Sequence, residues 1–69
     1  MLIYKFDVLN ALKEAGYNTG RLRKEKLLSE SSIQSLRRDK MIGIIALEKI
    51  CELLDMQPGN IIKYTKKEE

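Results

Sequence analysis

Hydrophobic residues recur at helical spacing near the start of the chain. Phe6, Leu9 and Leu12 are three positions apart, and polar residues such as Lys13 fall outside this row. The spacing predicts an amphipathic helix of about three turns that begins near residue 5. Gly16 ends it, because glycine readily adopts the left-handed conformation that follows a helix C-terminus.

Two further short helices are predicted in the middle of the chain. Asn18 and Ser29 are good N-cap residues, since their side-chain oxygens can accept from the unpaired N–H groups of a first helical turn. We expect helices over residues 19–26 and 30–38. Two helices this short and this close in sequence fit the spacing of a helix-turn-helix.

The second of these helices has an unusual outer face. Successive residues advance by about 100°, so burying Ile33 and Leu36 turns the opposite side toward solvent. Serine is a poor helix former, and its repetition there indicates a purpose other than folding. The opposite side carries Ser31, Gln34, Ser35 and Arg38.

The second half of the chain has a stronger hydrophobic pattern. Residues 44–55 predict a helix, and Pro58 can begin a last helical turn that carries Ile61 and Ile62. Ile45 lies off the apolar side of the long helix and is a candidate for a satellite of the core or, with less weight, for contact with a second copy. The apolar side is formed by Ile44, Leu47, Ile50, Cys51 and Leu54.

Both ends of the chain contain β-prone residues. The segments "LIYK" (2–5) and "IIKYT" (61–65) can pair into a small sheet, within one chain or between two, or can pack as coil on the helices. Residues 66–69 are expected to fray. We predict a single domain over residues 1–69, with its core at about 5–62. Its fold class is all-α, a compact five-helix domain that allows short β segments at the termini.

Composition limits the setting. A chain of 69 residues suits one domain, and a domain this small buries only about 60% of its unfolded surface, so a partner subunit would help. No apolar run approaches a membrane span, and no signal peptide is apparent. Cys51 cannot form an internal disulfide, which favours a reduced cytoplasmic setting, and a core position suits it better than a redox role.

The positive charge is concentrated in the middle third of the chain. The formal net charge is +3, whereas residues 20–40 hold seven basic and three acidic side chains, or +4. The remainder therefore sums to −1. Such a cluster favours a polyanionic partner such as nucleic acid, and the alternative is an ordinary solvated face.

Catalysis finds little support in the sequence. There is no histidine, and the lone cysteine has no activating partner. No group of residues has metal-ligand spacing, and no glycine-rich phosphate loop occurs. We expect a protein that is not an enzyme and that has no cofactor, metal or evident small-molecule effector.

The serine-rich face suits double-stranded DNA. In a major groove, Gln34 can hydrogen-bond base edges, small serine hydroxyls permit close approach, and Arg38 can bind guanine or phosphate. Ser29, at the helix start, could leave backbone N–H groups free for a phosphate. The alternative is an ordinary solvent-facing helix.

At this point the chain resembles a known family, the Cro and lambda-repressor type (XRE-like) of helix-turn-helix regulators. The likeness covers Phe6 to Ile62. It is carried by "GYNTGRLRKEKLLSESSIQSLRRDK" and by "LEKICELLDMQPGNI", which is closest to the short Cro-like regulators. The resemblance implies a lambda-repressor-like fold and a recognition helix over 30–38.

The resemblance also implies DNA-contacting residues. Thr19 falls where the family contacts phosphate or base at the start of its second helix. By the same correspondence, Glu30, Ser31 and Ser35 would face bases, and Ser32, Arg38 and Lys40 would hold phosphates. Helix geometry adds Gln34 to the base-facing group and gives Glu30 less weight. A carboxylate could still accept from a cytosine amino group.

Four positions depart from the family pattern. Arg23 replaces a small alanine in the second helix, and Leu27 replaces the turn glycine. Asp39 replaces the glycine after the recognition helix, although aspartate tolerates the left-handed region better than most residues. Gly43 replaces the serine that usually caps the fourth helix.

We expect sequence-specific binding of double-stranded DNA by a transcriptional regulator, with repression as the expected outcome. A homodimer on two half-sites about one helical turn apart would give enough contacts. The rival reading is a protein-interaction module, antitoxin-like or phage-derived, on the same helical fold.

Overall fold

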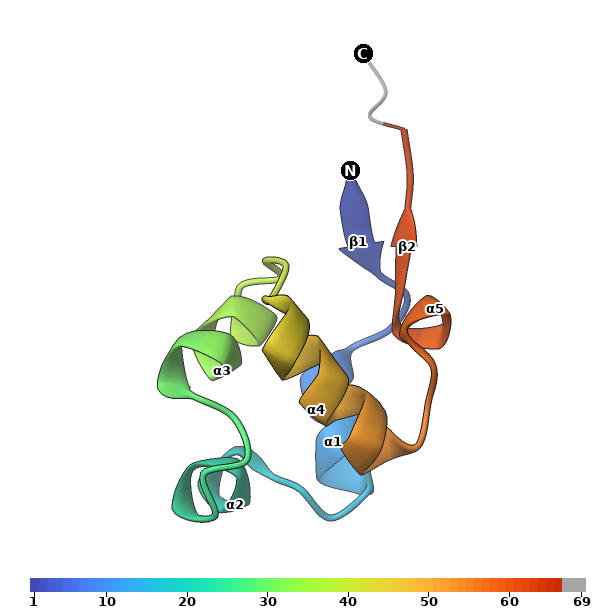
Figure 1. Ribbon diagram of the computed structural model, residues 1–69. Helices are drawn as coiled ribbons and strands as arrows, with labels where there is room; N and C mark the ends of the chain where they lie inside the picture. The colour runs from blue at the N-terminus through green and yellow to red at the C-terminus, as the bar shows by residue number, and fades with distance from the viewer. Residues whose placement is uncertain (67–69) are drawn as a thin grey trace.

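The computed structural model describes residues 1–66 and has the element order strand, five helices, strand (Figure 1). The five-helix prediction with β segments at both ends is confirmed. Of the predicted tail, residues 67–69 lie outside the described residues. The elements are β1 (Leu2–Tyr4), α1 (Val8–Glu14), α2 (Thr19–Lys24), α3 (Glu30–Arg37), α4 (Ile44–Leu54), α5 (Pro58–Ile61) and β2 (Ile62–Tyr64).

The two strands pair within the chain. β1 runs antiparallel to β2, with Ile3 opposite Lys63. The coil alternative is therefore wrong, and Ile62 belongs to β2 rather than to the last helical turn. The resulting two-stranded ribbon extends away from the helices (Figure 1). It holds residues 62–64 beside residues 2–4.

A single core joins all five helices. Leu12 of α1, Leu22 of α2, Ile33 of α3, Ile50 of α4 and Ile61 of α5 are fully buried. Burying one such side chain contributes about 1.5–3 kcal/mol, so these contacts dominate the stability of so small a domain. The other buried core residues are Val8, Leu28, Leu36 and Leu47.

The first helix is shorter than predicted. It starts at Val8 because Asp7 is its N-cap, and the Asp7 carboxylate accepts a 3.1 Å hydrogen bond from the Asn10 N–H. Phe6 therefore packs half-buried on the core from the preceding coil rather than from the helix. The hydrophobic spacing alone did not separate a residue inside the helix from one just before it.

Helices α1 to α4 end in the same way. After each, one residue turns left-handed and the next N–H bonds back to the last turn, which is the Schellman arrangement. Gly16 fills the position after α1 as predicted, at φ 97°. Asp39 (φ 58°) and Asp55 (φ 54°) fill it after α3 and α4.

The end of α2 corrects one expectation. The helix stops at Lys24, two residues early, and the left-handed residue is Lys26 (φ 54°), not Leu27. The Leu27 N–H then donates to the Leu22 carbonyl at 2.9 Å. The turn is one residue earlier because Leu27 and Leu28 point toward the core, which leaves the strained backbone position to an exposed lysine.

The start of α4 also differs from expectation. Ile44 is 79% exposed and does not belong to the core side of α4, whose buried residues are Leu47 and Ile50. Ile45 is 83% exposed, as its position off the apolar side indicated. Cys51 and Leu54 do pack against the core, as does Ile42 in the preceding loop.

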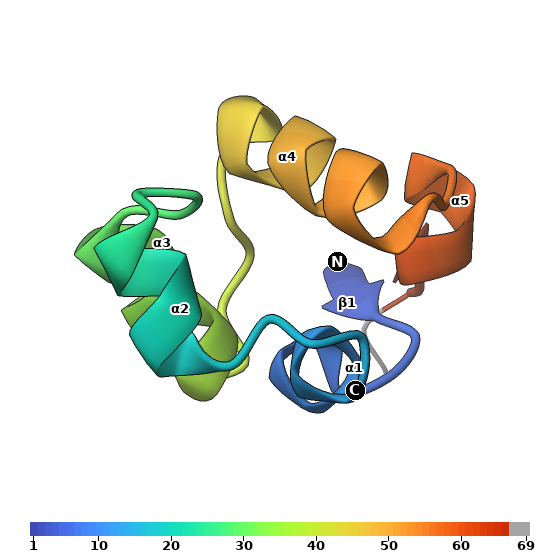
Figure 2. The ribbon, with the colours of Figure 1, turned by 90° about the horizontal axis from the view of Figure 1, so that it is seen from below.

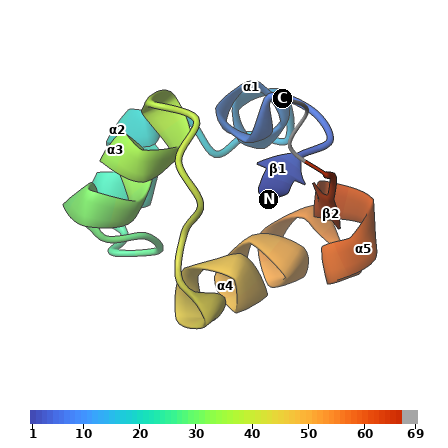
Figure 3. The same ribbon diagram turned by 90° about the horizontal axis from the view of Figure 1, so that it is seen from above.

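The helices surround the core in two groups. Figures 2 and 3 show α2 and α3 together at one side of the molecule, with α4 and α5 forming another side and α1 closing the gap. Within residues 1–66, no helix combines the length and apolar character that crossing a bilayer requires. The pair α2–α3 is thus held by the core on one side and open to solvent on the other.

Candidate nucleic-acid interface

The α2–α3 unit is fixed at both helix starts by side-chain caps. The Asn18 side-chain oxygen accepts from the Arg21 N–H at 2.8 Å, and the Ser29 hydroxyl accepts from the Ser32 N–H at 3.1 Å. Each cap satisfies one donor that a helix start would otherwise leave unpaired. Leu22 then anchors α2 in the core. The orientation of the two helices therefore follows from two polar caps and a few buried residues.

Helix α3 divides into the two faces that its sequence predicts. Ile33 is 0% and Leu36 is 9% exposed. On the other side Ser31 and Arg38 are exposed, while Gln34 and Ser35 are half-buried. Gln34 is less free than helix geometry alone implied, because its amide is engaged by a neighbouring carboxylate.

That carboxylate belongs to Glu30. It accepts two hydrogen bonds from the Arg23 guanidinium, at 2.6 and 3.1 Å, and one from the Gln34 amide at 3.3 Å. The Arg23 guanidinium, followed by Gln34, lowers the pKa of Glu30 below its ordinary value. Glu30 is therefore ionised near neutrality and is directed across to α2.

Two serines share the start of α3. The Ser29 hydroxyl donates to the Ser32 hydroxyl at 3.0 Å while accepting from the Ser32 N–H. The cap therefore uses one of the helix-start amides that a phosphate would otherwise bind. Ser29 is exposed and Ser32 is half-buried, so part of this pair remains open to solvent.

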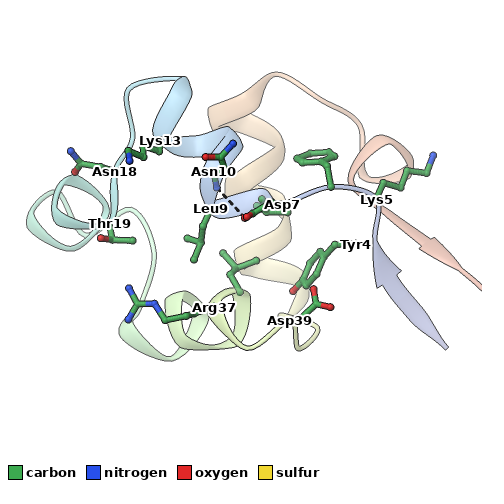
Figure 4. A pocket seen from close by; sticks show the side chains of 13 residues that line it. Tyr4, Lys5, Asp7, Leu9, Asn10, Lys13, Asn18, Thr19, Arg37 and Asp39 are labelled. Carbon is green, nitrogen blue, oxygen red and sulfur yellow. Dashed lines mark hydrogen bonds between the residues drawn. The ribbon is translucent and has the colours of Figure 1, made fainter.

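Thr19 opens α2 and lies half-buried beside a cleft between α1, α2 and the end of α3. The cleft has a volume of about 880 Å³. Figure 4 shows Lys13 of α1, Asn18 and Thr19 around one end of it, together with Arg37 of α3. Sequence reasoning did not select Arg37. Its position next to Arg38 in the basic cluster was the signal that could have found it.

The loop that carries Lys40 is held by the terminal ribbon. The Tyr4 hydroxyl donates to the Lys40 carbonyl at 2.5 Å and accepts from the Ile42 N–H at 3.1 Å. Burial is the main cause of a raised Tyr4 pKa, with Asp39 adding to it and the Ile42 N–H opposing it. Nothing in the local sequence around Lys40 pointed to this contact, because its partner lies 36 residues away.

The predicted residues lie at the start of α2, along α3 and in the loop that follows α3, and they carry hydroxyl, amide, carboxylate and cationic groups. Such a mixture can bind phosphates with its cations and helix-start groups and contact base edges with its central side chains. The predicted members are Thr19, Ser29, Glu30, Ser31, Ser32, Gln34, Ser35, Arg38 and Lys40.

Comparison with known families identifies the type of domain. The family model of the Cro/C1-type HTH DNA-binding domain matches residues 7–67. The chain belongs to this family. Its resemblance to Cro and lambda-repressor regulators is thereby confirmed, and so is DNA binding at the level of the domain. No curated protein and no solved structure matches the chain.

The family membership also indicates the broad class of activity. Cro/C1-type HTH domains are DNA-binding and not catalytic. The residues that the family model matches include α2, α3 and the core residues that hold both helices.

Proposed function

We propose that this Cro/C1-type domain is a transcriptional regulator that recognises a specific sequence in double-stranded DNA through α3. The observation that carries the proposal is the division of α3. Ile33 and Leu36 are buried in the core, while Ser31 and Arg38 are exposed on the far side. A helix anchored in this way can enter the major groove, which is wide enough to admit one.

The proposed roles follow from side-chain chemistry. Ser31, Gln34 and Ser35 face the base edges, and Arg38 and Lys40 hold phosphates on either side. Thr19 at the start of α2, with Ser29 and Ser32 at the start of α3, contacts the sugar-phosphate backbone. We add Arg37 to the proposed phosphate-contacting residues because it borders the same cleft as Thr19.

We further propose a homodimer that represses transcription. One recognition helix reads only a few base pairs, so two half-sites about one helical turn apart would be needed for specificity. Ile44 and Ile45 support a second copy, because two adjacent apolar side chains at 79% and 83% exposure are costly to leave in water. A dimer over a promoter would block access to it. The single cysteine supports a cytoplasmic setting.

The same pair of isoleucines is the observation that favours the alternative function. A protein-interaction module, antitoxin-like or phage-derived, would use Ile44 and Ile45 for a different protein partner. They line an open cleft of about 650 Å³ with Leu27 and Leu28, beside the start of α3. In that case DNA binding would be secondary to the protein contact.

A salt-titrated gel shift on random-sequence duplexes, followed by selection of the bound sequences, tests the proposal. Affinity should fall steeply with salt because counterions are released from neutralised phosphates. Gln34→Ala and Ser35→Ala should change the selected sequence, whereas Arg38→Ala and Lys40→Ala should weaken all duplexes alike. If all four variants bind DNA as the unaltered protein does, while Ile44→Ser or Ile45→Ser abolishes binding to a protein partner, the alternative is correct.

A further inference from the structure

A continuous polar chain crosses from α2 to the outer face of α3. Arg23 donates from Nε to one Glu30 oxygen at 2.6 Å and from its terminal nitrogen to the other at 3.1 Å. Gln34 donates its amide N–H to the same carboxylate at 3.3 Å. Three side chains, two of them expected to contact bases, are therefore held by one another before any DNA arrives.

Arg23 is distinguished by what it connects. Arg21, two residues earlier on α2, also bonds a carboxylate at 2.6 Å, but that carboxylate belongs to Glu25, the C-cap of the same helix. The Arg23 pair instead joins positions seven residues apart, on either side of the helix-turn-helix turn. A forked guanidinium on both oxygens fixes the plane of a carboxylate, which a single point contact does not.

The hydrogen-bond capacity of Glu30 determines how Gln34 is oriented. An ionised carboxylate is only an acceptor, so the Gln34 amide must turn its NH₂ group toward Glu30. The Gln34 carbonyl oxygen and its second N–H are then left for DNA. That pair complements the edge of adenine, which offers an N6 amino donor beside the N7 acceptor.

Arg23 also changes what the DNA meets at Glu30. A free carboxylate on the recognition face would repel phosphates and could accept from a cytosine amino group. With three donors on its two oxygens, Glu30 has little acceptor capacity left, and the arginine neutralises its charge. The cytosine contact considered from sequence is thereby disfavoured.

We propose that Arg23 is a positioning residue that acts through Glu30 to orient the Gln34 amide, so that Gln34 selects adenine at one base pair of the operator. This rests on the proposed sequence-specific binding by α3. Glu30 is then a support for Gln34 rather than a base contact.

The test compares binding ratios instead of overall affinity. Duplexes are first selected with the unaltered protein and with Gln34→Ala. The base pair at which the variant loses the sequence preference is the one assigned to Gln34. At that base pair, fluorescence anisotropy then gives the ratio of affinities for adenine over each other base. Arg23→Lys keeps the charge but loses the fork, and Glu30→Gln keeps the shape but can present either an oxygen or an N–H to Gln34.

Both variants should lower the adenine preference by about five- to tenfold, since one good bidentate contact gives discrimination of that order. Binding to the other bases should change little. In a Gln34→Ala background, Arg23→Lys should have no further effect on the ratio. Arg21→Lys is the matched control and should leave it unchanged. Circular dichroism melts check that every variant is folded.

The outcomes separate this inference from the proposed function. If selection yields no preferred sequence, sequence-specific binding fails, and the role of Arg23 fails with it. If Gln34→Ala relaxes an adenine preference that Arg23→Lys and Glu30→Gln leave intact, the positioning role alone is overturned. A preference for another base at that position, or none, also overturns it.

Discussion

Helices α3 and α4 both pack on the same core but expose different kinds of side chain to solvent. α3 starts at a serine side-chain cap, buries two residues and exposes small polar and cationic groups. α4 starts at Gly43 with no side-chain cap, buries an apolar side along its length and exposes two isoleucines in its first turn. The main feature of α3 is its exposed polar face, whereas α4 mainly supports the core.

The contrast separates the residues that stabilise the fold from those proposed to bind DNA. Residues of α3 that face outward cost helix stability, since serine is a poorer helix former than alanine or glutamate. α4 offsets that cost with Leu47 and Ile50 in the core. A substitution should therefore affect folding or DNA binding according to the face that it alters, and the following variants test this, from the largest expected effect to the smallest.

Ile33→Ala should unfold the domain or nearly so. It removes a fully buried side chain from α3, which costs about 2–5 kcal/mol in a core that small domains cannot spare. Ile44→Ala on α4 is the matched control and should change stability by less than about 0.5 kcal/mol. Urea denaturation measures both. Equal losses of stability would refute the assignment of Ile33 to the core and of Ile44 to the exposed surface.

Arg38→Ala should weaken binding to all duplexes by about tenfold and lower the salt slope by about one unit, because one phosphate contact is lost. Stability should be unaffected, since Arg38 is exposed. Lys49→Ala removes a positive charge from α4, where it pairs with Glu52, and should leave the salt slope unchanged. A gel shift at several salt concentrations distinguishes them. A change confined to one sequence would instead assign Arg38 to base contact.

Tyr4→Phe should destabilise the domain by about 0.5–1.5 kcal/mol by removing the hydroxyl that links the ribbon to Lys40 and Ile42. The Tyr4 pKa is raised in the folded state, so the hydroxyl contributes fully below pH 10.0 and its contribution is lost as pH rises through the folded value. Thermal melts across alkaline pH should converge for the two proteins. Tyr64→Phe, at a 70% exposed position, should match the unaltered protein throughout.

Ile45→Ser should have the smallest effect on folding, within about 0.5 kcal/mol, since the side chain is exposed. If a second copy covers it, the same change should shift the equilibrium toward monomer. Sedimentation equilibrium measures the shift. A variant that assembles like the unaltered protein would remove α4 from the dimer contact.

Much of the fold was predictable because it depends on local signals. Asn18 and Ser29 marked two helix starts through their capping chemistry, and the period of Ile33 and Leu36 gave the inner side of α3. Boundaries were less accurate. The competing cap at Asp7 shortened α1, and the inward packing of the residues after Lys26 shortened α2.

The site was only partly predictable, because sequence position gives direction but not partners. Ser31 and Arg38 are exposed as helix geometry indicated. The contact between Arg23 and Glu30 depends on the angle between two helices, and that between Tyr4 and Lys40 on the ribbon. Neither can be read from residue spacing, since each joins elements that only the completed core brings together.

The left-handed residues after α2, α3 and α4 are positions at which substitution by glycine can raise the stability of the folded protein. Each of Lys26, Asp39 and Asp55 occupies a backbone region that costs a residue with a Cβ atom roughly 1 kcal/mol. Asp55 lies at the far end of α4 from the recognition surface. Asp55→Gly should therefore give a more heat-tolerant protein in which the surface of α2 and α3 is unchanged.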